Sequence, residues 1–432
     1  MKLWQKNTTA NDKIIDFTVG KDRDFDLHLA AYDCQASIAH TQMLNKIGVL
    51  TEQEAQAIVE VLEELKSKAE NSKFVIEDSF EDMHSKIEFT LTEKLGDLGK
   101  KIHTARSRND QVLVAMHLYL KEEIAVIKTM TYDLFKLLIK LSKQHKDKLL
   151  PGYTHFQVAM PSSFGLWFSA YAESLIDDVT LLNAARKIVD QNPLGSAAGF
   201  GSSFPIDRKA TTESLNFRDL KYNVIAAQMS RGKAEKTTAF AIASLSANLS
   251  KMANDICLYM GQEHNFISFP EDLTTGSSIM PHKKNPDVFE LIRGKSNMLQ
   301  GLPNQLILLT SNLPSGYHRE MQLTKGLIIE GIEDIKDCLD IFNFSLKEIQ
   351  IREKILEDPK YKYVFSVDTL NQWVKEGMPF REAYKKMGES INKGDYQPKK
   401  ELDHTHLGSM GNLALDEIQT KMENALKSGS NV

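Results

Sequence analysis

Residues 111–150 read QVLVAMHLYLKEEIAVIKTMTYDLFKLLIKLSKQHKDKLL and contain neither glycine nor proline. Pro151 and Gly152 end this stretch. A helix of about 40 residues, at a rise of ~1.5 Å per residue, is a rod of roughly 60 Å. The sequence therefore predicts one very long helix here. Further runs without glycine or proline cover 166–192, 233–260 and 332–358.

Apolar residues in these runs recur at the spacing of one helix face. In the run 233–260, the i, i+3, i+7, i+10 pattern is formed by Ile242, Leu245, Leu249 and Met252. Strand signals are weak along the whole chain, so the sequence predicts an all-α fold. Because long helices leave apolar stripes uncovered in a single chain, we also expect self-association. An elongated monomeric bundle is the alternative.

The two ends of the chain differ from the middle because their helices are shorter. Thr51 and Glu54 form a capping-box signature, and apolar residues follow on one helix face at Ala55, Ile58, Val59, Leu62 and Leu65. Helices shorten again after Pro359. We therefore predict three helical parts, with the long helices in the middle one: residues 1–107, 108–358 and 359–432.

The composition is that of a soluble globular protein. The 432 residues include 53 Lys+Arg and 58 Asp+Glu, a net charge of −5, and 42% are hydrophobic. This slightly acidic balance argues against nucleic acid as a partner, because phosphate backbones bind strongly basic surfaces. The chain shows no apolar signal segment, no membrane span of ~18 residues and no disulfide pattern among its three cysteines. We expect a cytoplasmic protein without membrane contact, which binds anions only where cations cluster.

Cations cluster first at the start of the longest run, in KIHTARSRNDQ at 101–111. Arg106 and Arg108 bracket Ser107, and Asn109 adds an amide. A helix N-terminus with extra donors favours bound carboxylates. On spacing alone, a charged and capped helix start explains the same residues equally well.

Two later segments contain residues of catalytic type. In GYTHFQ at 152–157, His155 can act as an acid or a base near neutral pH, although a lone histidine is more often structural. In TGSSIMPHKKNPD at 275–287, a glycine and two serines precede two lysines and an asparagine, and Glu290 follows. Such a loop can present a hydroxyl, an ammonium group and an amide where negative charge develops. A purely structural loop is the alternative.

Two segments resemble nucleotide-binding or metal-binding motifs, but both motifs are incomplete. Gly294-Lys295-Ser296 ends like a P-loop, but position 289 is phenylalanine where that motif needs its first glycine. His404 and His406 have no partner set at the spacing of metal ligands. The sequence predicts neither a metal nor another cofactor.

Taken together, the three polar segments resemble the fumarase/aspartase superfamily and, within it, the argininosuccinate lyase family. The loop at 276–287 is similar to the signature SSxMPxKxN, which is long and specific. Residues 103–111 and 152–157 are similar to the family forms HTGRSRNDQ and GYTHLQ. The resemblance spans nearly the whole chain in the family's order, with further agreement at Glu81–His84, Pro193–Ser196 and Leu313–Tyr317.

The resemblance implies a reversible β-elimination that splits argininosuccinate into arginine and fumarate, as in arginine biosynthesis. By resemblance, Ser277 is the base that removes the Cβ proton of the succinyl group. Lys283 and Asn285 would meet the charge of the resulting carbanion. His155, paired with Glu290, would help to protonate the departing nitrogen or would orient the acid that does so. An ordinary serine is far too weak a base, so loop amides and nearby positive charge must stabilise its alkoxide.

The resemblance also implies how the substrate is held. The residues that match binding positions are Ser107, Arg108, Asn109 and Thr154 for the fumarate part, and Asp82, Tyr317, Gln322 and Lys325 for the arginine part. The family implies a homotetramer whose central helices form a shared bundle of twenty, with each site drawing on three subunits. That assembly would bury the apolar helix faces that a single chain leaves exposed.

Three departures from the family pattern matter. Ala105 replaces the usual glycine, and we expect little effect from one added methyl group. Leu3 and Trp4 lack the common GGRF continuation, so the resemblance does not support a substrate contact from that end. His282 stands where argininosuccinate lyases usually have glutamine and adenylosuccinate lyases often have histidine. Adenylosuccinate lyase is therefore the nearest rival, and another fumarate-releasing member of the superfamily is the wider alternative.

A rival of another class is a non-catalytic structural protein, since the lens delta-crystallins of this family show that the fold can lose its activity. The retention of Ser277, His155, Lys283 and Glu290 together argues against it. A helical scaffold for a protein partner would not need the signature loop.

Overall fold

The computed structural model describes residues 12–428 and is mainly helical, so the departure at Leu3 and Trp4 lies outside the described residues. The α-helices are α1 (Asp12–Val19), α2 (Asp22–Lys46), α3 (Glu52–Glu70), α4 (Met83–Leu95), α5 (Asp97–Lys100), α6 (Arg108–Gln144), α7 (Phe164–Val189), α8 (Arg208–Ser214), α9 (Val224–Gln228), α10 (Lys233–Met260), α11 (Asp287–Leu299), α12 (Leu302–Leu309), α13 (Thr324–Leu346), α14 (Ser366–Lys375), α15 (Phe380–Lys393) and α16 (Leu415–Ser428).

Short 3-10 helices and strands connect these helices. The 3-10 helices are η1 (Lys101–His103), η2 (Glu271–Leu273), η3 (Arg319–Leu323), η4 (Ile355–Glu357) and η5 (Pro359–Phe365). The strands form three two-stranded sheets, antiparallel β1 (Leu149–Thr154) with β2 (Gln157–Ser163), parallel β3 (Gln191–Asn192) with β4 (Asp219–Leu220), and antiparallel β5 (Ile267–Ser268) with β6 (Gln350–Ile351).

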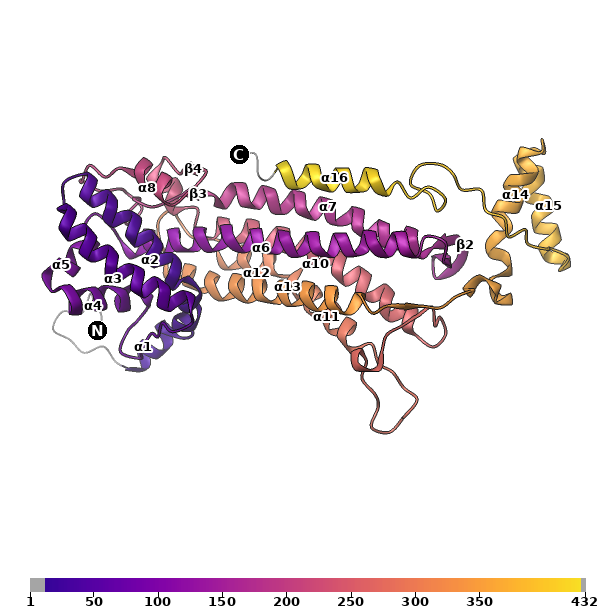
Figure 1. Ribbon diagram of the computed structural model, residues 1–432, viewed down its shortest axis with the longest axis horizontal. Helices are drawn as coiled ribbons and strands as arrows, with labels where there is room; N and C mark the ends of the chain where they lie inside the picture. The colour runs from indigo at the N-terminus through magenta and orange to yellow at the C-terminus, as the bar shows by residue number, and fades with distance from the viewer. Residues whose placement is uncertain (1–11, 429–432) are drawn as a thin grey trace.

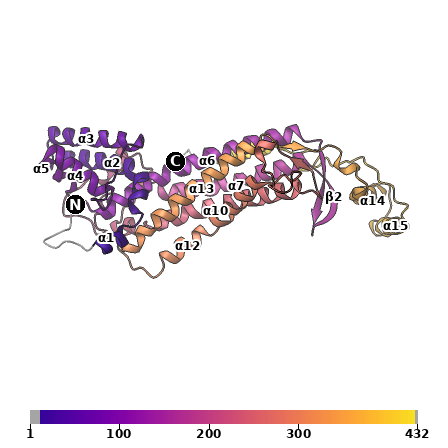
Figure 2. The same cartoon turned by 90° about the horizontal axis from the view of Figure 1, so that it is seen from below.

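The long helices α6, α7, α10 and α13 lie side by side along the molecule (Figures 1 and 2). Helices α1 to α5 pack at one end, α14 and α15 lie at the other, and α16 turns back to pack along α7. This arrangement confirms the predicted all-α class with a central set of long helices. One apolar core runs from Leu29 on α2 to Met422 on α16, and the boundaries at 107/108 and 358/359 stay a prediction.

Helix α6 has 37 residues, which at ~1.5 Å per residue makes it about 55 Å long. It ends at Gln144, so the prediction of helix for 145–150 was wrong. Leu149 and Leu150 instead pair with β2 in an antiparallel hairpin. The lack of glycine and proline marks where a helix can form, whereas pairing with a distant strand decides where this one ends.

Two other local patterns are confirmed. Helix α10 coincides with the predicted run 233–260, and its predicted apolar face is buried at Ile242, Leu245, Leu249 and Met252. At the start of α3, the Glu54 amide donates to the Thr51 hydroxyl (3.3 Å), and the Thr51 amide donates to the Glu54 carboxylate (3.0 Å).

The fourth predicted run was misplaced. Helix α13 spans Thr324–Leu346, whereas the run without glycine or proline covers 332–358. Gly326 and Gly331 lie inside the helix because neighbouring elements approach it closely, and a Cβ atom on Gly326 would lie 2.7 Å from the Phe25 ring. Tight packing therefore explains two glycines that read as helix breakers in the sequence.

Large apolar side chains on the outer faces of α10, α11 and α12 are exposed in this single chain. They include Phe240 (55% exposed), Leu291 (68%), Met298 (72%) and Leu308 (67%). Exposed apolar surface of this kind on long helices is typical of a protein–protein interface. The predicted uncovered stripe is present, and the number of subunits that cover it stays a prediction.

Candidate active site

Ser107 caps the N-terminus of α6 and fixes the polar segment before it. Its hydroxyl accepts a hydrogen bond from the Asn109 amide (3.2 Å), and its own amide donates to the Asp110 carboxylate (2.9 Å). Asp110 is fully buried and also accepts from the amides of Gly195 and Ala197. A segment more than 80 residues later in the chain therefore locks the start of α6 through one carboxylate.

The two arginines beside Ser107 point to different partners. Arg106 is buried, and its Nη1 donates to the Ser37 hydroxyl on α2 (2.8 Å). Arg108 is only half-buried, and its guanidinium group contacts the Asp82 carboxylate (3.1 Å) and the Ser85 hydroxyl (2.9 Å) at the start of α4. Arg106 thus ties the segment to the N-terminal helices, while Arg108 faces an open polar cavity.

Ala105 lies in this segment with φ of +59°, a left-handed conformation that glycine adopts without strain. Ala105→Gly should therefore raise the free energy of unfolding by about 1 kcal/mol, measured by chemical denaturation, which is more than the small effect expected from sequence. The control is Ala57→Gly in the interior of α3, which should lower it by about 1 kcal/mol. Equal losses at the two positions would contradict strain at Ala105.

A cavity of about 120 Å³ lies next to this segment, where the N-terminal helices meet the bundle. Predicted site residues from three separate segments line it: Asp82, Arg108, Asn109, Tyr317, Gln322 and Lys325. Gln322 is anchored by a hydrogen bond from its side-chain amide to the Thr18 carbonyl on α1 (3.0 Å). The fold thus brings together polar residues that lie far apart in the sequence.

Lys325 is buried on α13 and contacts two carboxylates of α2, Asp22 (2.7 Å) and Asp26 (2.6 Å). Burial acts to lower the pKa of Lys325, but the charges of Asp26 and Asp22 outweigh it and raise that pKa. Burial raises the pKa of Asp22 to about 6 even though Lys325 opposes it. One ammonium group therefore lies between two carboxylates of α2 in this part of the cavity wall.

Asp82 caps the N-terminus of α4, where its carboxylate accepts from the Ser85 amide (2.8 Å) and hydroxyl (2.6 Å). Burial acts to raise its pKa, but the charges of His84 and Arg108 and these hydrogen bonds outweigh it and hold the pKa of Asp82 below its usual value. His84 contacts the buried carboxylate of Asp33 (3.0 Å), whose charge outweighs burial and raises the pKa of His84. A negative group, Asp82, and a positive group, Arg108, therefore lie next to each other in the cavity wall.

Sequence reasoning missed several residues that line this cavity, namely Asp22, Asp26, His84, Arg231 and Arg319. A signal for the first two was present, because Asp22 and Asp26 are four residues apart and so lie on one helix face. Nothing local indicates Arg231, whose main-chain partner Met321 lies 90 residues away.

Thr154 and His155 lie elsewhere, at the tip of the hairpin β1–β2. Thr154 pairs with Gln157, so His155 and Phe156 form a two-residue turn. Both have positive φ (55° and 58°), which a type I′ turn requires and which costs non-glycine residues about 1–2 kcal/mol each. The tip presents the His155 side chain to solvent and leaves 86% of Phe156 exposed.

The predicted signature loop projects from the side of the bundle between η2 and α11 (Figure 1). The Ser277 hydroxyl oxygen accepts hydrogen bonds from the amides of Ile279 (3.3 Å) and Met280 (3.0 Å). Two amides aimed at one oxygen stabilise negative charge on it. The Ser277 hydroxyl thus closes a local turn of this exposed loop.

The returning arm of this loop carries the other predicted residues. Asn285 pairs with Thr275 across the loop, and its side-chain amide donates to the Gly276 carbonyl (3.4 Å). Lys283 is exposed. Glu290 lies in the first turn of α11, exposed, at 3.7 Å from Arg293.

The cavity, the hairpin tip and the loop do not form one site within a single chain. Ser107 caps the start of α6, and Thr154 lies in the hairpin that follows the other end of this helix, which is about 55 Å long. The loop with Ser277 is joined to the cavity by α11 and α12, which together add roughly 30 Å. The predicted pair of His155 and Glu290 is not formed within the described residues of one chain.

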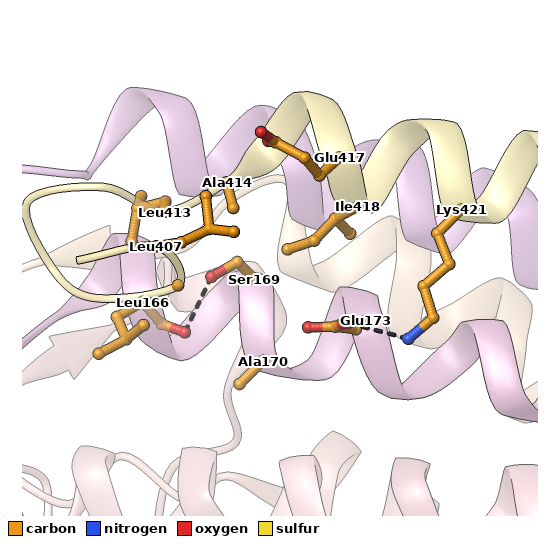
Figure 3. Close-up of a pocket in the computed structure, with 11 residues that line it drawn as sticks. Leu166, Ser169, Ala170, Glu173, Leu407, Leu413, Ala414, Glu417, Ile418 and Lys421 are labelled. Atoms are coloured by element: carbon orange, nitrogen blue, oxygen red, sulfur yellow. Dashed lines mark hydrogen bonds and ion pairs between the residues drawn. The ribbon is translucent and has the colours of Figure 1, made fainter.

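A wider cavity of about 380 Å³ lies between α7 and α16 (Figure 3). Leucine and alanine side chains line much of it, and an ion pair between Glu173 and Lys421 (3.0 Å) closes one side. It contains none of the predicted site residues, so its size does not make it the active site.

Two further features concern residues 12–428 as a whole. No three or more His, Cys, Asp or Glu side chains in this range gather as metal ligands would. None of the helices in the same range combines the length and the apolar character that crossing a membrane requires.

Known proteins match this chain over nearly its full length. A family model described as lyase matches residues 6–301. The argininosuccinate lyase of Parabacteroides distasonis is 51% identical over 429 residues, which cover 99% of this chain and 96% of that protein. The argininosuccinate lyase of Thermotoga neapolitana is 40% identical and covers 91% and 98%. The chain belongs to the argininosuccinate lyase family.

This member of the argininosuccinate lyase family shares its fold with solved structures of the fumarase/aspartase type. An EDDS lyase in complex with formate has a TM-score of 0.78 at 20% identity, covering 98% of this chain and 93% of that chain. A class II fumarase from Schistosoma mansoni has a TM-score of 0.72 at 17% identity, covering 92% and 91%. At these identities the likeness concerns the fold alone.

Proposed function

We infer that this chain is a carbon–nitrogen lyase that reversibly cleaves argininosuccinate to arginine and fumarate, a step of arginine biosynthesis. The observation that carries this inference is the 51% identity to an argininosuccinate lyase over 99% of the chain. The charges of the cavity wall support this proposal, because Arg108 and Lys325 suit carboxylates and the carboxylates of Asp22 and Asp82 suit cationic groups.

In the proposed mechanism, the alkoxide of Ser277 removes a proton from Cβ of the succinyl group. The electron pair of the broken C–H bond moves onto the adjacent carboxyl group and gives an aci-carboxylate. The amides of Ile279 and Met280 favour the alkoxide because they donate to its oxygen. Lys283 and Asn285 then stabilise the negative charge of the intermediate.

In the second step the electron pair returns to form the Cα–Cβ double bond, and the bond from Cα to the guanidino nitrogen breaks. His155, oriented by Glu290, helps to deliver a proton to that nitrogen, so arginine leaves in its protonated form. His155 suits this role because an imidazole ring can both accept and donate a proton and the strained hairpin tip presents the ring to solvent.

The substrate assignment divides the binding residues into two sets. Ser107, Arg108, Asn109 and Thr154 would hold the fumarate part. Asp82, Tyr317, Gln322 and Lys325 would hold the arginine part. All of these except Ser107 and Thr154 line the one cavity, Ser107 caps the adjacent helix, and Thr154 would arrive from another subunit.

We propose a homotetramer in which each site takes the cavity, the hairpin tip and the signature loop from three different subunits. Two observations support this assembly, namely the separation of the three groups within one chain and the exposed apolar faces of α10, α11 and α12. We also propose a cytoplasmic location, in keeping with three cysteines that are all free thiols.

Fumarate release tests the function. Purified protein should release fumarate from argininosuccinate, followed by its absorbance, and none from adenylosuccinate. His282→Gln, which restores the family's usual residue, is the matched control and should leave this choice of substrate unchanged. Fumarate from adenylosuccinate alone would establish the rival function, and fumarate from neither compound would contradict both.

A further inference from the structure

Arg231 and Glu235 form a buried ion pair at the start of α10 that the proposed mechanism does not use. Their side chains are 3% and 0% exposed, and Arg231 Nε lies 3.1 Å from Glu235 Oε1. Gly232 caps the helix between them with φ of +76°, and a Cβ atom there would lie 2.9 Å from the Thr310 side chain. The ion pair is therefore held in a closely packed turn.

Both charged groups reach across to the segment 317–325, which forms one side of the cavity. Arg231 Nη2 donates to the Met321 carbonyl (3.0 Å), and Arg231 Nε lies 3.4 Å from the Thr324 hydroxyl. The Thr324 hydroxyl is buried and lies 3.0 Å from the Glu235 carboxylate. Each of the two contacted residues directly precedes a side chain assigned to the arginine part of the substrate.

Arg231 also touches the cavity itself, since it belongs to the cavity wall together with Gln322 and Lys325. Its Nη1 has no hydrogen-bond partner within residues 12–428. The planar guanidinium group can hold the Glu235 carboxylate and a main-chain carbonyl at the same time, a geometry that an ammonium group does not reproduce. The side chain therefore joins helix α10 to the wall that carries two binding residues.

We propose that Arg231 is a positioning residue for the arginine part of the substrate. Together with Glu235 it fixes the main chain at Met321 and Thr324 and so sets Gln322 and Lys325 within the cavity. This proposal rests on the proposed function, because it concerns the binding of argininosuccinate. A residue of this kind changes how strongly the substrate binds without removing a group that transfers protons.

The test compares the steady-state kinetics of the wild type, of Arg231→Met/Glu235→Gln and of Arg231→Lys. The double variant removes both charges at similar volume, so that no lone charge stays buried. In the double variant we expect the KM for argininosuccinate to rise about tenfold or more while kcat stays within about threefold. The inhibition constant of arginine should rise by the same factor, that of fumarate should not change, and Arg231→Lys should lie in between.

Lys121→Met is the matched control. Lys121 pairs with Asp190 (2.8 Å) in another mostly buried ion pair, outside the segment 317–325, so its loss should leave both inhibition constants unchanged. The activity of the wild type towards argininosuccinate tests the proposed function, whereas the variants test only the positioning role. An unchanged arginine inhibition constant in a folded variant, or a fall in kcat at constant KM, overturns the positioning role. If the double variant does not fold, Arg231→Lys decides by the same readout.

Discussion

Ser277→Ala should lower kcat by a factor of about 10²–10⁴, the range that a positioned general base typically contributes. This corresponds to about 3–5 kcal/mol of transition-state stabilisation. The alanine variant keeps the amides of Ile279 and Met280 in place but offers them no oxygen to stabilise. Within residues 12–428 these two amides donate to no other hydroxyl that could lose a proton in its place, so a higher pH should restore little activity.

Ser278→Ala is the matched control for this variant. Ser278 neighbours Ser277 on the same exposed loop, so its replacement disturbs the loop to a similar degree. It should keep activity within about tenfold of the wild type, as expected for a residue that transfers no proton. Both variants should retain the wild-type circular dichroism and elution volume. Full activity in Ser277→Ala, or equal losses in the two variants, would contradict the assignment of the base.

Lys325→Met should have the largest effect on stability among single substitutions in the cavity. It removes the cation that lies 2.7 Å from Asp22 and 2.6 Å from Asp26 and leaves a fully buried and a largely buried carboxylate without it. Removing one partner of a buried ion pair typically costs 3–5 kcal/mol, so we expect a loss of about that size in the free energy of unfolding. Denaturant titration followed by circular dichroism measures it.

The loss in Lys325→Met should also depend on pH. The pKa of Asp22 is already raised to about 6 with the lysine present, and without Lys325 it should rise further. A carboxyl group whose pKa is higher in the folded than in the unfolded state stabilises the fold when protonated, and this contribution is lost as pH rises through the folded pKa. The deficit should therefore be smaller near about pH 5 than near about pH 8.

Lys295→Met serves as the control for Lys325→Met. Lys295 pairs with Asp334 at the same distance of 2.7 Å, but its side chain is 42% exposed. A half-exposed ion pair contributes about 1 kcal/mol or less, so this variant should be nearly as stable as the wild type. Equal losses in the two lysine variants would show that burial of the cavity charges is not what makes Lys325 important.

The fold could be predicted from the sequence where neighbours along the chain decide it. Helix α10 and the capping box at Thr51 follow from local spacing, and both are confirmed. The hairpin at residues 149–163 and the glycines of α13 could not be predicted in this way. Strand pairing ends α6, and a close approach of the Phe25 ring explains Gly326, so in both cases a distant contact outweighs local propensity.

In the candidate site, too, local patterns could be predicted and distant contacts could not. Its motif residues could be selected from the sequence because they stand in specific patterns that resemble a known family. Arg231 could not, since its role depends on how α10 packs against the start of α13. The spacing of Asp22 and Asp26 indicates a shared helix face but not their contact with Lys325 on α13. The separation of the motifs into a cavity, a hairpin tip and a loop could not be predicted either, because a sequence gives no distances between residues in space.

The central claim is that a complete site needs more than one chain, and mixing two inactive variants tests it most directly. Asn109→Ala alters the cavity and Ser277→Ala alters the loop. If the two parts come from different subunits that mix at random in equal amounts, one half times one half, or about a quarter, of the sites receive both native parts. We predict that co-refolded variants recover about a quarter of the wild-type activity. Activity no higher than the average of the two separate variants would contradict the claim.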